Sequence, residues 1–291
     1  MIHLTVRHTT TYTYANPVRL GEHRMMLRPR DSHDLRLVKA DLSISPKATL
    51  RWMHDVFGNS IALARFDEPT TELRIESTLQ IERYPGDPRR VEVTPEARVY
   101  PFIYSSEDRQ DLARLVDLHY PDPKGALAAW AKGFVTAQPM DTLELVSSIN
   151  SSIRQQFGYG VRNEEGTQTP QETLELGSGT CRDFALLMIE ALRSLGVAAR
   201  FVSGYLYDPA LDGGSHGVRG AGATHAWVEA YLPGAGWIEY DPTNGIIGSD
   251  ALLRIAVTRD PSQAIPISGE FTGRSGDFTG MKVDVDVTTR R

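Results

Sequence analysis

The first hundred residues alternate between hydrophobic and polar side chains, and short turn segments separate the alternating stretches. A period of two residues places every second side chain on one face, as in a strand with one buried face. The alternating stretches cover residues 3–14, 35–45, 49–64 and 72–83. Turn sequences occur at residues 55–60 (DVFGNS) and 84–88 (YPGDP). We therefore predict an N-terminal β-sandwich over residues 1–100, with a linker around Pro85 and Pro88.

Beyond residue 100 the hydrophobic residues recur at the three- and four-residue spacing of helices. Helices are predicted over residues 112–118, 125–134, 142–157 and 181–195. Asp141 is a suitable N-cap for the third of them. The fourth has the clearest apolar face, and Gly196 is placed to end it.

Short β-like stretches follow these helices, joined by loops that contain Gly and Pro. They cover residues 198–206, 225–232 and 237–240. A last alternating stretch, residues 281–287, follows a Gly-rich connector, and the sequence does not indicate which sheet it joins. Helices followed by an antiparallel sheet predict an α+β fold. The predicted units are the β-sandwich, a catalytic core over residues 101–264, and a C-terminal connector and strand over residues 265–291.

Composition and charge narrow the class of protein. The chain has 291 residues, of which 41% are hydrophobic and 23% charged, as in a globular protein of about two domains. A net charge of −6 argues against nucleic acid or an anionic membrane as a partner. Apolar runs are too short to span a bilayer, and the N-terminus lacks the pattern of a secretory signal. We expect a cytoplasmic protein whose oligomeric state the sequence leaves open.

Cys181 is the only cysteine, which excludes an intrachain disulfide and any zinc site that needs two thiolates from this chain. It follows the small residues 177–180 (GSGT) and opens the predicted helix. The free N–H groups of a first helical turn stabilise an anion there, so we expect a thiolate well below the usual thiol pKa of about 8.5. The alternative is a small buried hydrophobic residue on the helix.

His225 and Asp241 supply the other two groups that a thiol nucleophile needs. His225 begins one β-stretch and Asp241 ends the next, and residues 233–236 (PGAG) form a turn between them. In a hairpin the start of the first strand lies beside the end of the second, so the two side chains become cross-strand neighbours. An imidazole held by a carboxylate is the base that activates a thiol. Taken singly, they also fit a half-exposed strand residue and a turn-forming Asp.

The remaining candidates carry less specific signals. Tyr159, between two glycines, is a candidate donor to the oxyanion, together with the backbone N–H of Cys181. Trp227, Trp237 and His216 are candidates for lining a substrate groove, and His216 also rivals His225 as the base. No histidine pair has metal-ligand spacing, so we predict neither a metal nor a cofactor. Arginines at positions 24, 28 and 30 indicate a docking patch or a solvated edge.

The motifs resemble those of a known family. Residues 177–207 (GSGTCRDFALLMIEALRSLGVAARFVSGYLY), 224–245 (THAWVEAYLPGAGWIEYDPTNG) and 157–160 (FGYG) are similar to the transglutaminase-like core. This is a papain-like thiol fold, and its Cys, His and Asp match Cys181, His225 and Asp241. The opening LTVRHTTTYTYANPVRLGEHRMMLRPR resembles the β-domain that precedes this core in bacterial transglutaminase-like proteins. The resemblance also implies ATP-grasp and alpha-E proteins as possible partners in peptide metabolism.

The leading hypothesis is a thiol enzyme that forms a thioester with the acyl part of a peptide or isopeptide amide and passes it to water or an amine. Hydrolysis is favoured, because the sequence shows no site that would bind an amine and exclude water. One alternative is an acyltransferase that uses a thioester donor, as arylamine acetyltransferases do. The other is a non-catalytic interaction protein with a vestigial triad.

Overall fold

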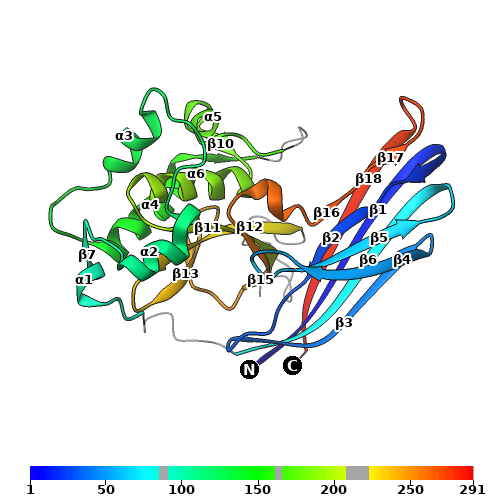
Figure 1. The fold of residues 1–291 in the computed structure, drawn as a ribbon, viewed down its shortest axis with the longest axis horizontal. Helices are drawn as coiled ribbons and strands as arrows, with labels where there is room; N and C mark the ends of the chain where they lie inside the picture. Colours follow the sequence, from blue (N-terminus) through cyan, green and yellow to red (C-terminus); the bar gives the residue numbers. More distant parts are fainter. Residues whose placement is uncertain (85–90, 161–165, 208–222, 291) are drawn as a thin grey trace.

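The structure is a computed structural model that describes residues 1–84, 91–160, 166–207 and 223–290. The expected linker at Pro85 and Pro88 lies outside the described residues. Figure 1 shows helices at one end of the molecule, a central sheet, and a β-sandwich at the other end. No helix in the described segments is long and apolar enough to cross a membrane.

The sandwich consists of two antiparallel sheets that enclose one apolar core. One sheet contains β17 (Phe271–Thr272), β1 (Ile2–Leu20), β6 (Thr70–Arg83), β3 (Leu35–Ser45) and β18 (Phe278–Arg290). The other contains β16 (Ile267–Ser268), β2 (His23–Arg28), β5 (Ser60–Phe66) and β4 (Ala48–His54). Leu73 and Ile75 from the first sheet meet Met25 and Ala64 from the second, and all four are buried. Period-two alternation thus produced the predicted sandwich.

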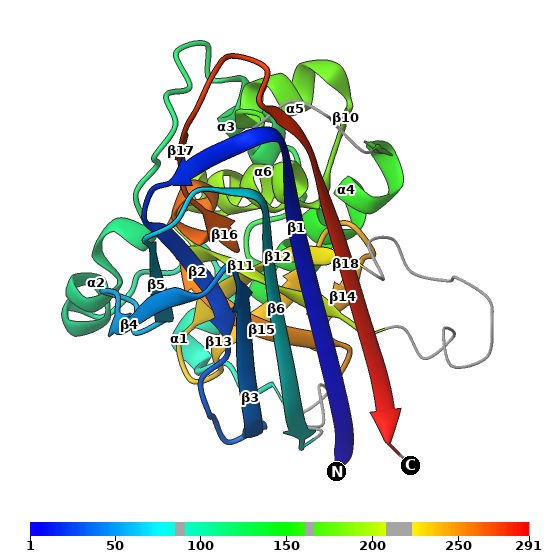
Figure 2. The ribbon, with the colours of Figure 1, turned by 90° about the vertical axis from the view of Figure 1, so that its right-hand side faces the viewer.

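The C-terminal strand belongs to this sandwich, which the sequence left open. β18 pairs antiparallel with β1 from His3↔Arg290 to Tyr14↔Phe278. Figure 2 shows the two strands, and with them the two chain termini, side by side. The connector also pairs with the sandwich, through β16 to β2 and β17 to β1. Residues 265–290 are therefore structurally part of the N-terminal domain.

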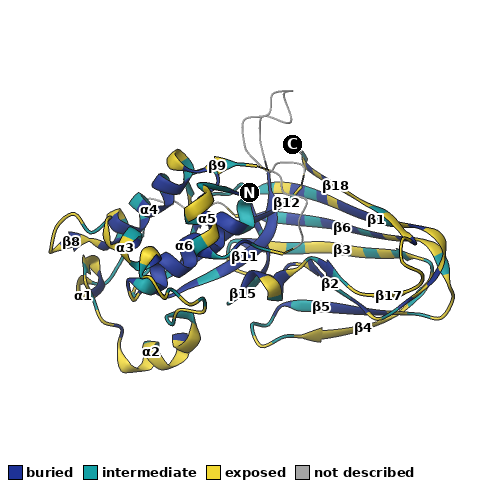
Figure 3. Ribbon diagram, turned by 90° about the horizontal axis from the view of Figure 1, so that it is seen from above, coloured by how far each residue is buried: buried dark blue, intermediate teal, exposed yellow. Residues whose placement is uncertain are grey.

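The core begins with a group of helices that surround one central helix. These are α1 (Pro95–Arg98), α2 (Ser106–Leu112), η1 (Ala113–Leu115), α3 (Ala126–Lys132), α4 (Thr142–Gln156), α5 (Pro170–Leu176) and α6 (Cys181–Ser194). The helix expected over residues 112–118 lies earlier, because Ser105 caps α2 by accepting the Asp108 N–H at 3.0 Å. Helix α6 is buried along almost its whole length (Figure 3), and Gly196 follows it at φ +79°.

A five-stranded sheet in the order β14-β13-β12-β11-β15 packs against α6. Its strands are β11 (Ala199–Leu206), β12 (Thr224–Leu232), β13 (Gly236–Asp241), β14 (Ile246–Ile247) and β15 (Leu252–Thr258). Two short pairs flank the helices, β7 (Val99–Tyr100) with β8 (Met140–Asp141) and β9 (Gly158–Tyr159) with β10 (Ser178–Gly179). Helices packed on an antiparallel sheet confirm the predicted α+β class.

The sandwich and the core share a buried apolar interface. Tyr205 and Leu253 of the core sheet pack with Leu4, Leu79 and Val285 of the sandwich. Polar contacts cross the same interface, because the Asn59 amide donates to the Val257 carbonyl at 2.7 Å and accepts the Val257 N–H at 2.9 Å. Hydrophobic burial and satisfied hydrogen bonds therefore fix the two domains to each other.

A buried histidine in this interface makes stability depend on pH. The two ring nitrogens of His8 lie 2.8 Å from the Tyr205 hydroxyl and 2.9 Å from the Thr10 hydroxyl. Burial lowers the pKa of His8 to about 4, while the unfolded chain retains about 6.5. The folded state then binds fewer protons between these values, so His8 stabilises the fold above pH 6.5 and loses this contribution as the pH falls toward 4.

We expect the free energy of unfolding to decrease by up to about 3 kcal/mol over this window through His8 alone. Urea unfolding of the wild type and of His8→Gln at several pH values measures this contribution as a difference. His54→Gln, at an exposed position, is the matched control. Parallel pH profiles for the wild type and His8→Gln would contradict the assignment.

Candidate active site

Cys181 is the first residue of α6, and the turn before it is held by one buried carboxylate. Asp183 accepts the Thr180 N–H at 2.8 Å and the Thr180 hydroxyl at 2.9 Å through one oxygen. Its other oxygen accepts the Gln168 N–H at 2.7 Å. A Cβ on Gly179 would lie 2.9 Å from the Asp183 Cβ, so only glycine fits there. Asp183 therefore fixes the backbone that presents Cys181, a structural role that the sequence left undefined.

Tyr159 is brought near this turn by the short parallel pair β9 and β10. The Gly160 N–H donates to the Gly179 carbonyl at 3.0 Å, and the Gly158 N–H donates to the Gly177 carbonyl at 2.8 Å. The Tyr159 ring is half-buried and lies tilted against Phe184, with ring centroids 6.4 Å apart. The structure thus places Tyr159 beside the cysteine turn while also packing its ring.

His225 and Asp241 form a fully buried pair at the ends of β12 and β13. The distance from His225 Nε2 to Asp241 Oδ2 is 2.9 Å. This contact leaves Nδ1 as the ring nitrogen available to another group, and Nδ1 is buried and makes no hydrogen bond to the described residues. The hairpin turn thus brings together two residues sixteen positions apart, as the strand pattern predicted.

Charge on the neighbouring groups favours the imidazolium form of His225. Burial lowers its pKa, but Asp241 and then Cys181 outweigh burial and raise the pKa to about 10. Asp241 responds in the opposite direction: burial raises its pKa, whereas His225 and Asn244 outweigh burial and lower it. These opposite shifts favour an imidazolium beside a carboxylate, and Cys181 lies close enough to His225 to add to the rise in its pKa.

Asn244 is a site residue that sequence reasoning missed. Its side-chain amide donates to Asp241 Oδ2 at 2.8 Å, and its backbone N–H donates to Oδ1 at 3.3 Å. Oδ1 also accepts the Thr243 N–H at 2.9 Å. The available signal was the sequence DPTNG, in which an Asp starts a turn whose N–H groups point back at its own carboxylate.

Replacing Asn244 by Ala removes one donor from the Asp241 oxygen that also accepts from His225. A hydrogen bond to a charged group contributes about 1.5–3 kcal/mol, so we expect turnover to fall by about ten- to a hundredfold. Asn16→Ala is the matched control, because that amide donates to Asp277 at 2.9 Å in the sandwich. Equal activity of Asn244→Ala and wild type would show that Asp241 does not need this donor.

Trp227 was a candidate for a substrate groove, but the structure places it in the core. Its side chain is fully buried, and its ring stacks on His225 with centroids 6.1 Å apart and an interplanar angle of 28°. Its indole N–H donates to Glu239 Oε1 at 3.3 Å. A groove-lining residue requires an exposed face, so Trp227 is instead a buried support for the His225 ring.

The other candidates lie apart from this pair or outside the described residues. Trp237 is half-buried, and the Arg200 guanidinium lies 4.0 Å from its ring centroid. His216 lies outside the described residues. No group of three or more His, Cys, Asp or Glu side chains placed to hold a metal ion occurs among the residues that are described.

A cysteine at the start of a buried helix, with a His–Asp pair on the sheet packed against that helix, defines the papain-like class of thiol folds. Two protein-family models match parts of the chain. The transglutaminase-like superfamily model matches residues 128–242, and the model of the bacterial transglutaminase-like N-terminal region matches residues 4–82. The chain therefore resembles bacterial transglutaminase-like proteins in two regions: its core matches the transglutaminase-like superfamily, and the β-sandwich in front of the core matches the bacterial N-terminal region.

Known proteins resemble the chain over different lengths. A protein from Mycobacterium tuberculosis is 29% identical over 290 residues, which cover 96% of this chain and 91% of the relative. A protein-glutamine gamma-glutamyltransferase from Pseudomonas aeruginosa is 38% identical over 66 residues, or 23% of this chain and 10% of that protein. A crystal structure described as a proposed cysteine protease from Cytophaga hutchinsonii has a TM-score of 0.71 and 19% identity, covering 98% of this chain and 90% of that one. The similarity to the Cytophaga hutchinsonii structure establishes the fold.

Proposed function

We propose that the chain is a thiol enzyme that cleaves amide bonds of peptides or proteins through an acyl-thioester on Cys181. The observation that carries this proposal is the buried contact of 2.9 Å between His225 Nε2 and Asp241 Oδ2, which leaves Nδ1 of the ring for a thiol. The match of residues 128–242 to the transglutaminase-like superfamily supports thiol-dependent hydrolase or transferase chemistry in general.

In the first half of the reaction, the Cys181 thiolate attacks the amide carbonyl carbon and a C–S bond forms. The carbonyl oxygen becomes an oxyanion, for which the Cys181 N–H at the start of α6 and Tyr159 are the proposed donors. The imidazolium of His225 then gives its Nδ1 proton to the leaving nitrogen as the C–N bond breaks. The products are a free amine and a thioester, while Asp241 continues to accept from Nε2.

In the second half, water or an amine attacks the thioester. His225 takes the proton of the nucleophile at Nδ1, the C–S bond breaks, and Cys181 returns as a thiolate beside an imidazolium. We favour water as the acceptor for the reason given from the sequence: nothing identifies a site that binds an amine and excludes water. Acyl transfer from a thioester donor would use the same groups and is a second outcome of the test.

The test is mass spectrometry of glutamine-containing and isopeptide-linked peptides incubated with the wild type and with Cys181→Ala. Cleavage or deamidation that requires Cys181 indicates hydrolysis, and incorporation of an added primary amine indicates transfer. An acyl adduct on Cys181 that forms only from a thioester donor would select the acyltransferase alternative. Absence of every product and adduct across the library, in a folded protein with a reactive thiol, would favour an interaction protein.

A further inference from the structure

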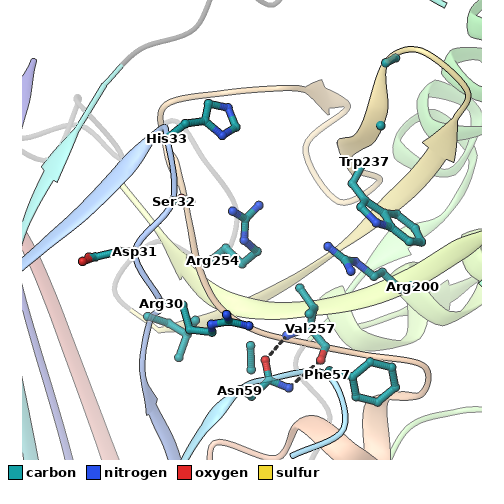
Figure 4. A pocket seen from close by; sticks show the side chains of 14 residues that line it. Arg30, Asp31, Ser32, His33, Phe57, Asn59, Arg200, Trp237, Arg254 and Val257 are labelled. Atoms are coloured by element: carbon teal, nitrogen blue, oxygen red, sulfur yellow. Dashed lines mark hydrogen bonds between the residues drawn. The ribbon is translucent and has the colours of Figure 1, made fainter. Parts of the chain in front are cut away.

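A pocket of about 470 Å³ lies between the sandwich and the core sheet, apart from Cys181 and His225. The sandwich contributes Arg30, Phe57 and Asn59 to its lining, and the core contributes Arg200, Trp237 and Arg254 among others. Figure 4 shows the guanidinium groups of Arg30, Arg200 and Arg254 directed toward the same space, whereas Asp31 points away from it. Pockets of this size at domain junctions commonly hold small molecules.

The three arginines retain donors that the protein does not use. Arg200 pairs through Nε with Glu229 at 2.6 Å, and Arg254 pairs through Nη1 with the other oxygen of Glu229 at 2.8 Å. Arg254 also lies 3.8 Å from an Asp34 oxygen and 3.7 Å from a Glu239 oxygen, without a hydrogen bond to either. Both terminal amino groups of Arg200 have no acceptor within the described residues. Arg30 has neither an ion pair nor a hydrogen bond there. One buried carboxylate thus holds two guanidiniums in place, and N–H groups remain for a ligand.

Further contacts position the groups that line the pocket. The Arg200 guanidinium lies 4.0 Å from the Trp237 ring centroid, which fixes its plane. Asn59 makes two hydrogen bonds to Val257 across the domain interface at the edge of the pocket. Gly58 leaves the space that Arg30 occupies, since a Cβ on Gly58 would lie 2.2 Å from Arg30 Nη1. Because Arg200 and Arg254 are already held by Glu229, an anion would bind them at a lower entropy cost than it would bind free arginine side chains.

We propose that this pocket binds a small anion with carboxylate or phosphate groups, held by Arg30 of the sandwich and Arg200 and Arg254 of the core. Planar guanidiniums match the paired oxygens of both groups. Trp237 and Phe57 add apolar surface beside the donors, which suits a ligand with an apolar part. Arg24 and Arg28 do not join this site: Arg24 Nη1 lies 3.5 Å from the Gln263 carbonyl, and Arg28 lies 6.0 Å from the Trp52 ring centroid.

The test measures the melting temperature of the full chain against citrate and inorganic phosphate, with sodium chloride at equal ionic strength as the reference. We expect a saturable rise in melting temperature for at least one of the two anions. Arg30→Gln should raise the half-saturating concentration at least about tenfold, because it removes the only guanidinium that the sandwich contributes to the described lining. Without anion it should melt like the wild type, since Arg30 is exposed and makes no hydrogen bond or ion pair with a described residue. Arg51→Gln, an exposed change of equal charge on β4, should behave as the wild type.

Three results would overturn the proposal. The first is a response no greater than that of sodium chloride. The second is an equal half-saturating concentration in Arg30→Gln and the wild type. The third is a response to a tetraglutamate peptide but to neither small anion, which would assign the pocket to acidic segments of proteins. None of these results depends on Cys181, so this test is independent of the proposed activity.

Discussion

Replacement of His225 by Gln is expected to reduce turnover by at least about a thousandfold. The variant removes the imidazolium beside Cys181, so the thiolate loses its counter-ion and the leaving amine loses its proton donor. Alkylation by iodoacetamide at pH 7 provides a readout that needs no substrate, and we expect it to slow by about tenfold or more. Mass spectrometry of the single cysteine measures the rate directly.

His216→Ala is the control for this variant, because His216 is the rival base in the sequence. We expect it to leave alkylation at the wild-type rate and to change mainly the affinity for substrate. Equal losses in the two variants would leave the base unassigned. If a folded His225→Gln protein were alkylated at the wild-type rate, the imidazole would not act on Cys181.

Replacement of Asp241 by Asn is expected to reduce turnover by about a thousand- to ten-thousandfold. All four groups that contact the carboxylate within the described residues are donors: His225 Nε2, the Thr243 N–H, and the backbone and side-chain N–H groups of Asn244. An amide must turn its NH₂ toward some of these donors whichever way it is oriented. The imidazole then loses the acceptor that keeps its proton on Nε2 and leaves Nδ1 toward the thiol.

Circular dichroism and the melting temperature establish whether Asp241→Asn is folded, and pH profiles of turnover and of alkylation separate a positioning role from a loss of structure. Asp286→Asn, an exposed change on β18, is the matched control. If folded Asp241→Asn retained wild-type turnover and the wild-type pH profile, Asp241 would not be part of the catalytic group.

Local patterns predicted the longest helices and strands, since each depends on neighbouring residues, but they did not predict β2, β15 or α5. Alternation predicted the sandwich strands, and the apolar face after Cys181 predicted α6 with its end at Gly196. The pairing of β12 with β13 followed from the PGAG turn, which brought His225 near Asp241. Helix α2 begins earlier than the apolar pattern predicted. Its N-cap, Ser105, lies in a polar stretch, whereas the prediction relied on the apolar residues that follow.

The sequence by itself determined the α+β class, the sandwich, and a chain order that puts a cysteine on a helix and a His and an Asp on a hairpin. Only the tertiary structure decided that β18 pairs with β1, because such a pairing joins residues almost the whole chain apart and no local signal encodes it. It also decided that Trp227 is buried behind His225, since alternation gives the face of a strand but not what covers that face. The arginine pocket likewise exists only where two separately predicted domains meet.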